Sequence, residues 1–571
     1  MNHVRDALSQ LITAALVDAI DAGELPLSEV PDPALERPRE LAHGDWATSV
    51  ALRSSKAAGM NPRQIAEIVS ARIAGHADVD AVEIAGPGFI NIRLSATALQ
   101  RVLLEARNGG LEFGRSNAGA GRRVQVEFVS ANPVGPMHVG HGRWAALGDS
   151  MARILEHAGW SVEREFYIND AGVQMDIFAK SVAARYLEQC GRTVTFEPEW
   201  YQGTYIAEIA REIFSAEGDS WADRPAGERE SHFKETAYVA VLEHLKHVLH
   251  DMGVDFDVWF SERTLHEAVA GGPTAIERGI ATLREAGYIF DLDGAVWFRS
   301  TDFGDDKDRV LVKADGDYTY FAADIAYHKN KFDRGFDRVI NIWGADHHGY
   351  VARMKAAVAA LGHEGQLDVV IGQLVNLFRN GEAVRMSKRT GEMVTFEELL
   401  GEVGADAARY WFLRRSTDQP VDFDIELARQ QSADNPVFYV QYAHARICSI
   451  LRKAAGDEVA ARYATVAALS AEFVSGDADL SLLADPAELT LMRKLSEFTE
   501  VAESAAADLA PYRLTRYAED LATVFHQFYT VCRVMSDDPA LTAARLYAVD
   551  ATRSVLETVL ALLGVSAPEK M

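Results

Sequence analysis

Two histidines, His138 and His141, have a type and a spacing that point to chemistry. At the start of a helix, a three-residue spacing places both imidazoles on one face, where they could contact a single ligand. Gly140 and Gly142 remove side chains beside them, so a ligand could approach the backbone closely, as the polyphosphate of a nucleotide does at a helix N-terminus. The pattern is neither G-x-G-x-x-G nor G-x-x-x-x-G-K-[ST], and so it indicates neither a dinucleotide fold nor a P-loop. Taken alone, it is equally consistent with a helix cap that carries two incidental histidines.

The segments around the histidines predict a strand, a helix and a second strand. Apolar side chains alternate in residues 124–130, which is typical of a strand. Apolar residues then recur at mostly three- and four-residue steps from Val139 to Gly159, which predicts a helix closed by glycine, and alternation returns in residues 160–170. The first turn of such a βαβ unit lies at the carboxyl end of a strand, where open α/β sheets bind ligands.

A second motif, RMSKRTG, occupies residues 385–391, in a glycine-flanked loop far downstream. HVGH followed by MSK is the paired signature of class I aminoacyl-tRNA synthetases, whose usual forms are HIGH and KMSKS. The longer segments VEFVSANPVGPMHVGHGR, FYINDAGVQ, YFAADIAYHKNKF, RMSKRTG and NPVFYVQYAHAR resemble arginyl-tRNA synthetases. The resemblance runs nearly end to end, and the sequence is identified as a member of that family.

The resemblance implies ATP-dependent ligation of L-arginine to tRNA(Arg) through an arginyl-adenylate, with release of AMP and pyrophosphate. Mg²⁺ would accompany ATP and pyrophosphate, and no structural metal held by the protein is expected. Chemistry of this kind requires chiefly positioning and charge stabilisation. Two alternatives are an RNA-independent nucleotidylyltransferase and a non-catalytic tRNA-binding paralogue. The first would leave the N-terminal domain and the C-terminal third unexplained, and the second would need neither the histidines nor the lysine of MSK.

By family position, the resemblance implies three groups of site residues. His138, His141 and Lys388 would be catalytic: the imidazoles stabilise the pentacoordinate phosphate, and the ammonium stabilises the leaving pyrophosphate. The residues that would bind ATP are His138, Gly140, His141, Met386, Ser387 and Lys388. The residues that would bind arginine are Ser130, Asn132, His138, Glu262, Tyr320, Asp324 and His347.

Within the arginine set, Glu262, Tyr320 and Asp324 would recognise the guanidinium, because this planar cation matches a carboxylate in a bidentate fashion. Tyr320 and Asp324 are four residues apart at an expected strand-to-helix junction, so phenol and carboxylate could converge. Asp324 could instead be the N-cap of the helix, and Glu262 could be a solvated surface residue. His347 stands where some members of the family carry glutamine. It and His348 are expected to point to opposite sides of an extended chain, so a shared metal is not expected.

The composition is that of a soluble globular protein of several domains. The chain has 571 residues, of which 48% are hydrophobic and 25% charged. No apolar run could span a membrane, and the N-terminus predicts an amphipathic helix rather than a signal peptide. Cys190, Cys448 and Cys532 form no metal or redox pattern, so buried free thiols in a reducing compartment are expected, and hence a cytoplasmic protein. A monomer is expected.

The formal net charge of −27 opposes generic nucleic-acid binding, because phosphate contacts require lysine and arginine. Charge acts locally, however, so an acidic body can carry a basic groove. We therefore expect a strongly uneven surface potential.

The expected fold is a multidomain α/β protein built around a class I, Rossmann-like parallel sheet. Its expected parts are an N-terminal α+β domain that contacts the D-loop of the tRNA (1–115), the first half of the catalytic domain (116–195), a mainly helical insertion (196–295), the second half of the catalytic domain with the MSK loop (296–395), and a C-terminal all-α bundle that binds the anticodon (396–571).

Finer expectations concern strands and aromatic residues. The catalytic sheet is expected to resume within residues 295–321, just before a helix that opens at Asp324, and LDVVIGQLVNLF (367–378) is expected to form one further strand. On the C-terminal helix after Asn435, aromatic residues at helical spacing would mostly belong to the core, while the resemblance implies that some exposed ones stack on unpaired bases. These residues are Phe438, Tyr439, Tyr442 and His444.

Overall fold

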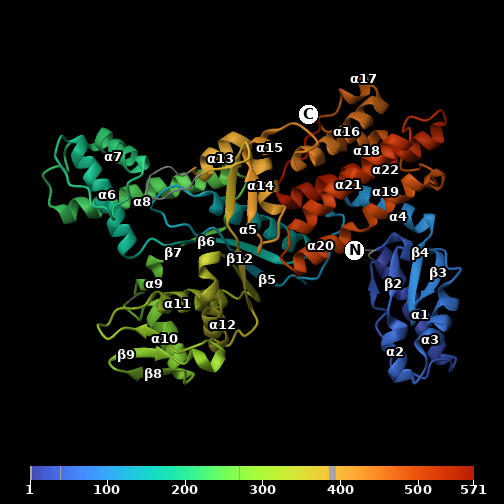
Figure 1. Cartoon of the computed structure of the whole chain (residues 1–571), viewed down its shortest axis with the longest axis horizontal. Coiled ribbons are helices and arrows are strands. Elements are labelled where there is room, and N and C mark those ends of the chain that lie inside the picture. The colour runs from blue at the N-terminus through green and yellow to red at the C-terminus, as the bar shows by residue number, and fades with distance from the viewer. Residues whose placement is uncertain (1–2, 39, 269–270, 385–393) are drawn as a thin grey trace.

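A five-stranded parallel sheet lies at the centre of the chain in the computed structural model, which describes residues 3–38, 40–268, 271–384 and 394–571 (Figure 1). All neighbouring strands are parallel, and their order is β12-β11-β5-β6-β7. The strands are β5 (Arg123–Glu127), β6 (Ser161–Ile168), β7 (Val258–Ser261), β11 (Arg338–Gly344) and β12 (Leu367–Gly372). The order reverses between β5 and β11, and the carboxyl ends of these two strands flank the switch point where such sheets bind ligands. This Rossmann-like core confirms the predicted fold class.

The predicted βαβ unit forms the middle of the sheet. α5 (Val139–His157) connects β5 to β6 and ends before Gly159, whose φ of 84° is left-handed. β5 is buried from its second residue onward, as expected for a parallel strand covered on both faces. Gly148 lets α5 approach the sheet closely, because a Cβ there would lie 2.1 Å from the ring of Phe128.

The N-terminal part combines helices with an antiparallel sheet of order β1-β2-β4-β3, as predicted. β3 and β4 form a hairpin around residues 86–88. The elements are α1 (His3–Asp21), β1 (Leu35–Glu36), η1 (Leu41–His43), β2 (Trp46–Thr48), α2 (Val50–Ala58), α3 (Pro62–Ile73), β3 (Val79–Ala85), β4 (Phe89–Leu94), α4 (Ala96–Gly109) and η2 (Gly110–Glu112). α4 packs against helices of the C-terminal bundle, so this part is mounted on the bundle (Figure 1).

Three helices project from the parallel sheet between β6 and β7: α6 (Val173–Gln189), α7 (Thr204–Glu217) and α8 (Ala226–Asp251). Met175, Phe178, Val182 and Tyr186 of α6 are buried, so this face of the helix belongs to the core. The stretch expected to be a mainly helical insertion nevertheless contains β7, an edge strand of the parallel sheet. Four residues are too few to show a strand periodicity, which is why the sequence did not reveal this strand.

A separate three-stranded antiparallel sheet corrects the prediction that the catalytic sheet resumes within residues 295–321. Its order is β10-β9-β8, and the tight connection at Asp293–Gly294 makes β8 and β9 a hairpin. Hairpin strands are antiparallel, so they cannot continue a parallel sheet; the parallel sheet resumes only at β11. The elements here are α9 (Arg263–His266), α10 (Ala275–Glu285), β8 (Ile289–Leu292), β9 (Ala295–Phe298), η3 (Ser300–Phe303), β10 (Arg309–Val312), α11 (Tyr320–Asp333), η4 (Ala345–Tyr350) and α12 (Val351–Ala360).

The single strand predicted over residues 367–378 is in fact two strands in two sheets. After β12 the chain turns at Gln373, and β13 (Val375–Arg379) pairs with β14 (Glu382–Ala383) and β15 (Val421–Asp424). Arg143 of α5 is fully buried and donates to the carbonyls of Gln373 and Ser416, at 2.7 and 2.9 Å, so α5 fixes this turn. The neighbouring helices are α13 (Phe396–Val403), α14 (Ala405–Leu413) and α15 (Ile425–Arg429).

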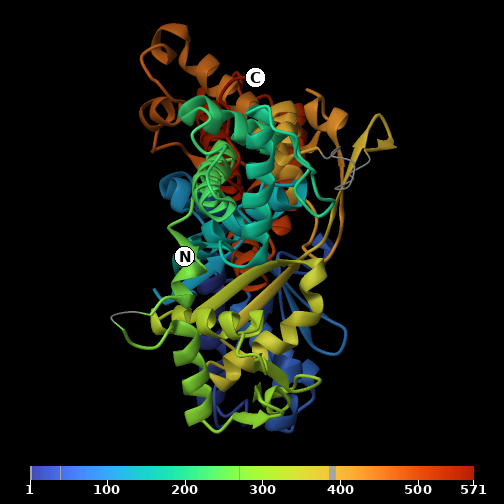
Figure 2. The same cartoon turned by 90° about the vertical axis from the view of Figure 1, so that its left-hand side faces the viewer.

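The C-terminal part is a helical bundle, as predicted. Its helices are α16 (Pro436–Ala455), α17 (Asp457–Ala460), α18 (Val466–Phe473), η5 (Leu480–Leu482), α19 (Pro486–Ser496), α20 (Phe498–Ala507), α21 (Tyr512–Val531) and α22 (Pro539–Leu563). On α16, His444 is buried, Phe438 and Tyr439 are half-buried and Tyr442 is exposed, so these residues divide between core and surface. Figure 2 shows the bundle and the projecting helices toward one end, and the N-terminal part and the antiparallel sheet toward the other.

None of the helices in the described ranges is both long and apolar enough to cross a bilayer. Cys448 and Cys532 are buried and Cys190 is half-buried, and all three thiols are free. The prediction of buried free thiols is therefore confirmed for two of the three cysteines.

Candidate functional site

A cavity of about 1640 Å³ opens beside the carboxyl ends of the parallel strands, where the βαβ unit predicts a site. Most of the candidate residues contribute to its wall: Ser130, Asn132, His138, His141, Glu262, Tyr320, Asp324 and His347. Gly140 lies in the first turn of α5, between the two histidines. Met386, Ser387 and Lys388 lie outside the described residues.

The two histidines begin α5, and their rings stack with centroids 3.6 Å apart. The backbone N–H of His138 donates to Nδ1 of His141 at 3.3 Å, so the pair also caps the helix. Because Nδ1 of His141 accepts this bond, its Nε2 carries the proton in the neutral ring and can donate. Trp144 lies edge-on to both rings, at 5.7 and 5.2 Å. His138 and His141 therefore both cap α5 and line the cavity.

Chain segments from distant parts of the sequence meet at His138. Thr395 forms an isolated antiparallel bridge with His138, and the N–H of Phe396 donates to the carbonyl of Met137 at 2.9 Å. Thr395 follows directly on the segment that contains the MSK motif, so the chain leaving that segment lies beside the first motif. On the opposite wall, the Tyr205 hydroxyl of α7 donates to the carbonyl of Val134 at 2.8 Å, which ties the projecting helices to the same turn.

The end of β5 is held in an unusual conformation. Val129 and Ser130 have positive φ values of 67° and 42°, which are costly for residues other than glycine and persist only where the surroundings impose them. The Ser130 hydroxyl donates to Glu127 at 3.0 Å and accepts from the N–H of Tyr167 at 3.2 Å. Lys331, which is fully buried, donates to the other oxygen of Glu127 at 2.5 Å. The predicted strand over 124–130 therefore ends at Glu127, and this network explains the turn.

Two carboxylates face the cavity from different elements. Glu262 follows directly after β7 and is only 6% exposed, so it is not a solvated surface residue. Asp324 lies in the second turn of α11, whose N-cap is Thr319, so the N-cap alternative for Asp324 is wrong. The Tyr350 hydroxyl donates to Oδ2 of Asp324 at 2.5 Å, and the Tyr167 hydroxyl is hydrogen-bonded to Glu262.

The surroundings disfavour ionisation of both carboxyl groups. Burial, with the nearby charge of Asp324, raises the pKa of Glu262 to about 7. Burial also raises the pKa of Asp324 to about 6; the Tyr350 hydrogen bond lowers it, and the charge of Glu127 raises it. Among the described residues of the cavity wall there is no lysine or arginine, while carboxylates are numerous: Glu127, Glu208, Glu212, Glu262, Asp324, Asp346, Glu397 and Glu398. The wall is thus suited to a cationic ligand group.

Tyr320 and His347 occupy the rim rather than the interior. Tyr320 lines the cavity but is 75% exposed, and the hydroxyl that reaches Asp324 belongs to Tyr350. His347 and His348 lie in η4, so the expectation of an extended chain is wrong. Nε2 of His347 is 3.5 Å from Asp346, and only His347 of the two lines the cavity.

Sequence reasoning missed Tyr167, Tyr350, Glu127 and Lys331. Glu127 and Tyr167 stand near the carboxyl ends of predicted strands, a placement that could have marked them. Tyr350 and Lys331 carry no such signal, because their partners are 26 and 204 residues away in the sequence.

Comparison with known proteins covers all parts of the chain. Three family models match: "Arginyl tRNA synthetase N terminal domain" over residues 3–94, "tRNA synthetases class I (R), catalytic domain" over 100–432, and "DALR anticodon binding domain" over 440–571. The curated proteins of Heliobacterium modesticaldum and Moorella thermoacetica, each named arginine–tRNA ligase, are 49% and 48% identical to it, and each match covers 100% of both chains. The solved arginyl-tRNA synthetase of Thermus thermophilus shares the fold, with a TM-score of 0.73 at 24% identity over 99% of this chain and 100% of that one.

Proposed function

The chain belongs to the arginyl-tRNA synthetase family, and from this premise we propose that it carries out that family's reaction, the ATP-dependent ligation of L-arginine to tRNA(Arg), with the residues described above. One observation carries the proposal: a single cavity joins the stacked pair His138 and His141 to a wall of carboxylates in which no lysine or arginine is described. A nucleotidylyltransferase without RNA gains no support, since the match extends over the whole chain, and a non-catalytic paralogue would have no use for the histidine pair.

In the first step, an oxygen of the arginine carboxylate attacks the α-phosphorus of ATP. The bond from that phosphorus to the bridging oxygen breaks, and pyrophosphate leaves. His138 and His141 stabilise the charge on the pentacoordinate phosphate by donating hydrogen bonds from their side of the cavity. In the second step, the 2′-hydroxyl of the terminal ribose attacks the activated carbonyl, AMP leaves, and the hydroxyl proton passes to solvent. The protein contributes positioning and charge stabilisation rather than a covalent intermediate.

Arginine lies with its guanidinium between Glu262 and Asp324, since Glu262 is buried, Asp324 is half-buried, and each carboxylate is hydrogen-bonded to a tyrosine hydroxyl. Tyr320, at the rim of the cavity, contacts the guanidinium end of the arginine. The amino-acid end is held by Ser130 and Asn132 from the turn after β5, together with His138 and His347. Because the guanidinium supplies the charge that this pocket lacks, arginine binding favours the ionised form of both carboxyl groups.

ATP lies at the N-terminus of α5, with its phosphates near His138, Gly140 and His141. Mg²⁺ enters with ATP and leaves with pyrophosphate, bound mainly by phosphate oxygens, because imidazoles and backbone N–H groups are poor ligands for this ion. Met386, Ser387 and Lys388 complete the nucleotide site, with the Lys388 ammonium stabilising the leaving pyrophosphate. The position of Thr395 beside His138 supports this part of the proposal.

The tRNA engages several parts of the chain. We assign anticodon binding to the bundle within residues 396–571 and contact with the D-loop to residues 1–115, while residues 116–195 and 296–395 carry the catalytic halves around the insertion at 196–295. The enzyme works as a monomer in the cytoplasm.

The test is pyrophosphate exchange into ATP with each standard amino acid, with and without bulk tRNA, followed by charging of tRNA with labelled arginine. Exchange and charging with arginine alone are expected. Exchange with another amino acid would contradict the roles of Glu262 and Asp324, and the absence of exchange and charging under every condition would contradict the function.

A further inference from the structure

The carboxylate of Asp324 accepts a hydrogen bond from a tyrosine that belongs to another element. Tyr350 is the last residue of η4, and its hydroxyl donates to Oδ2 of Asp324 on α11 at 2.5 Å. The ring is held independently of this bond: Trp343 and Phe321 meet it edge-on at 5.9 and 6.0 Å, and the Arg353 guanidinium lies 4.7 Å from its centroid. Packing therefore fixes the hydroxyl, and the hydroxyl in turn fixes the carboxylate.

The orientation of the Asp324 carboxylate plane affects how well it can bind the guanidinium of arginine. The terminal torsion of an aspartate is broad, so a carboxylate without a partner samples many orientations. A bidentate contact with a guanidinium requires two parallel N–H···O bonds in one plane. Each carboxylate oxygen can accept more than one hydrogen bond. Oδ2 can therefore accept from Tyr350 and also take part in the bidentate contact with the guanidinium.

We propose that Tyr350 is a positioning residue for arginine, whose hydroxyl orients the Asp324 carboxylate toward the guanidinium and favours its ionised form. The inference rests on the proposed function, because it names the residue that prepares one of the two guanidinium carboxylates. Tyr350 lies outside the set of site residues expected from the sequence, since nothing in the sequence pairs it with Asp324.

The charge around Asp324 gives the proposal a second observable. The charged and titratable groups that face Asp324 and Tyr350 are Glu127, Tyr167, Glu262, Lys331, His347 and Arg353. On the same helix, Nδ1 of His328 is hydrogen-bonded to the Asp324 carbonyl, and burial lowers the pKa of His328 to about 3, so this ring stays neutral. Burial raises the pKa of Asp324, and the hydroxyl of Tyr350 opposes that shift. Without the hydroxyl the pKa of Asp324 is higher still, so more of the carboxyl is protonated at a given pH and unavailable to a cation.

The experiment compares the wild-type enzyme with Tyr350→Phe, which keeps the ring and removes the hydroxyl. Charging of tRNA is measured at saturating ATP and tRNA, from about pH 5.5 to about pH 8.5, to obtain kcat/KM for arginine. In Tyr350→Phe we expect an arginine KM about tenfold higher near neutral pH, an unchanged ATP KM, and an acid limb of kcat/KM displaced to higher pH.

Tyr318→Phe is the matched control, because its hydroxyl is also hydrogen-bonded to a carboxylate, Glu277, but Tyr318 does not line the cavity. This control should keep the wild-type arginine KM and acid limb. If Tyr350→Phe does not fold, Tyr350→Met serves instead. A variant at position 350 with a wild-type arginine KM and an unmoved acid limb overturns the inference. If the wild-type enzyme charges no arginine, it is the proposed function that fails.

Discussion

Glu262 shows at the scale of a single residue how a recognition site is kept at the expense of stability. The carboxyl group is buried near Asp324, and Nε2 of His266 lies 3.7 Å from it. Burial raises its pKa to about 7, so the folded state binds its proton more tightly than the unfolded state does. The contribution of Glu262 to folding stability is therefore greatest below the ordinary carboxyl pKa of about 4.3. It is lost as the pH rises through about 7. In the proposed function, the guanidinium of arginine would supply a compensating positive charge on binding.

Glu262→Gln should therefore be more stable than the wild type at about pH 8, by about 1–3 kcal/mol, and of equal stability near pH 4. The reason is that glutamine has no charge to bury. Arginine charging should be lost in the same variant. Thermal unfolding at the two pH values is the measurement, and Glu267→Gln, at an exposed position nearby, should show no pH-dependent gain. A variant less stable than the wild type at about pH 8 would contradict the argument.

The individual residues of the site were predictable to different degrees. His138 and His141 could be placed from their spacing, because the following helix is long and regular. Asp324 could be identified from the sequence, but its hydrogen bond with Tyr350 could not, because Tyr350 belongs to another element. The pair of Lys331 and Glu127 joins positions 204 residues apart, and no local pattern predicts which distant side chains meet.

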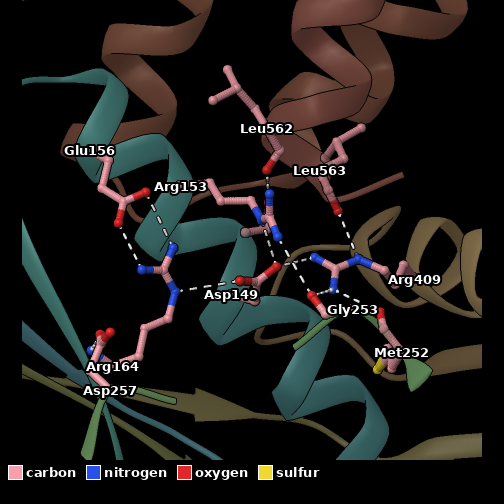
Figure 3. A network of polar contacts seen from close by, with 11 residues as sticks. Asp149, Arg153, Glu156, Arg164, Met252, Gly253, Asp257, Arg409, Leu562 and Leu563 are labelled. Carbon is pink, nitrogen blue, oxygen red and sulfur yellow. Dashed lines mark hydrogen bonds and ion pairs between the residues drawn. The ribbon is translucent and has the colours of Figure 1, made fainter. Parts of the chain in front are cut away.

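At the scale of elements, α5 is fixed at its N-terminus and at its middle. Its N-terminus carries the histidines, and its middle carries Asp149, which is buried among three arginines (Figure 3). Burial opposes ionisation of Asp149, but Arg409, Arg153 and Arg164 outweigh it and hold its pKa below the usual range. Arg409 of α14 is fully buried; besides Asp149 it donates to the carbonyl of Leu563, at the end of α22, and to that of Met252, just after α8, at 3.1 and 3.2 Å. One guanidinium thus joins the catalytic helix to the bundle and to the projecting helices.

Arg409→Met should lower the free energy of unfolding by about 3–5 kcal/mol, because it leaves Asp149 and two carbonyl groups buried with fewer donors. Arg414→Met is the matched control. Arg414 lies just after the same helix, but it pairs with Glu519 at 43% side-chain exposure, where such a pair contributes about 0–1 kcal/mol. Thermal unfolding of the two variants provides the comparison. Equal losses would show that the Arg409 junction does not hold these elements together.

Elements were predicted best where they are long. The βαβ unit and the helix after Asn435 follow from periodicity alone. β7 and β8 were missed because four residues show no period, and the stretch that contains β9 and β10 was assigned to the wrong sheet. Alternating residues indicate that a strand exists, but they do not indicate which strand it pairs with, and this is decided by connections such as the tight turn at Asp293–Gly294.

At the scale of the whole molecule, charged side chains join the N-terminal part to the bundle. Arg37 donates to the Ser496 carbonyl at 2.8 Å and lies 3.3 Å from Glu500, and Arg5 is paired with Glu503 at 2.5 Å. Asp45 accepts from Arg493 at 2.8 Å. Burial raises the pKa of Glu500 to about 6 although Arg37 and Arg5 oppose the shift. The orientation of this part, to which we assign contact with tRNA, thus depends on ionic contacts that salt weakens.

Replacing Arg5 and Arg37 together with methionine should loosen the N-terminal part without unfolding it, because the helices and sheet of that part pack on their own core. Small-angle scattering should show a larger radius of gyration, and protection from hydrogen exchange should fall in α19 and α20. Arg63→Met is the control, since Arg63 is exposed and its contacts with Glu67 and with the Gly86 carbonyl both lie within the N-terminal part. An unchanged radius in the double variant would show that the ionic contacts do not set the arrangement.

The junction at Asp149 also sets an order of events during synthesis. Ser150, next to Asp149 on α5, donates to the carbonyl of Leu562, which lies 412 residues further along the chain. At translation rates of about 5–20 residues per second, α5 leaves the ribosome tens of seconds before that partner exists. Throughout this interval the nascent catalytic domain holds an acidic group and several arginines without all their final contacts. The buried contacts of α5 with the end of α22 can therefore form only after the bundle has been translated.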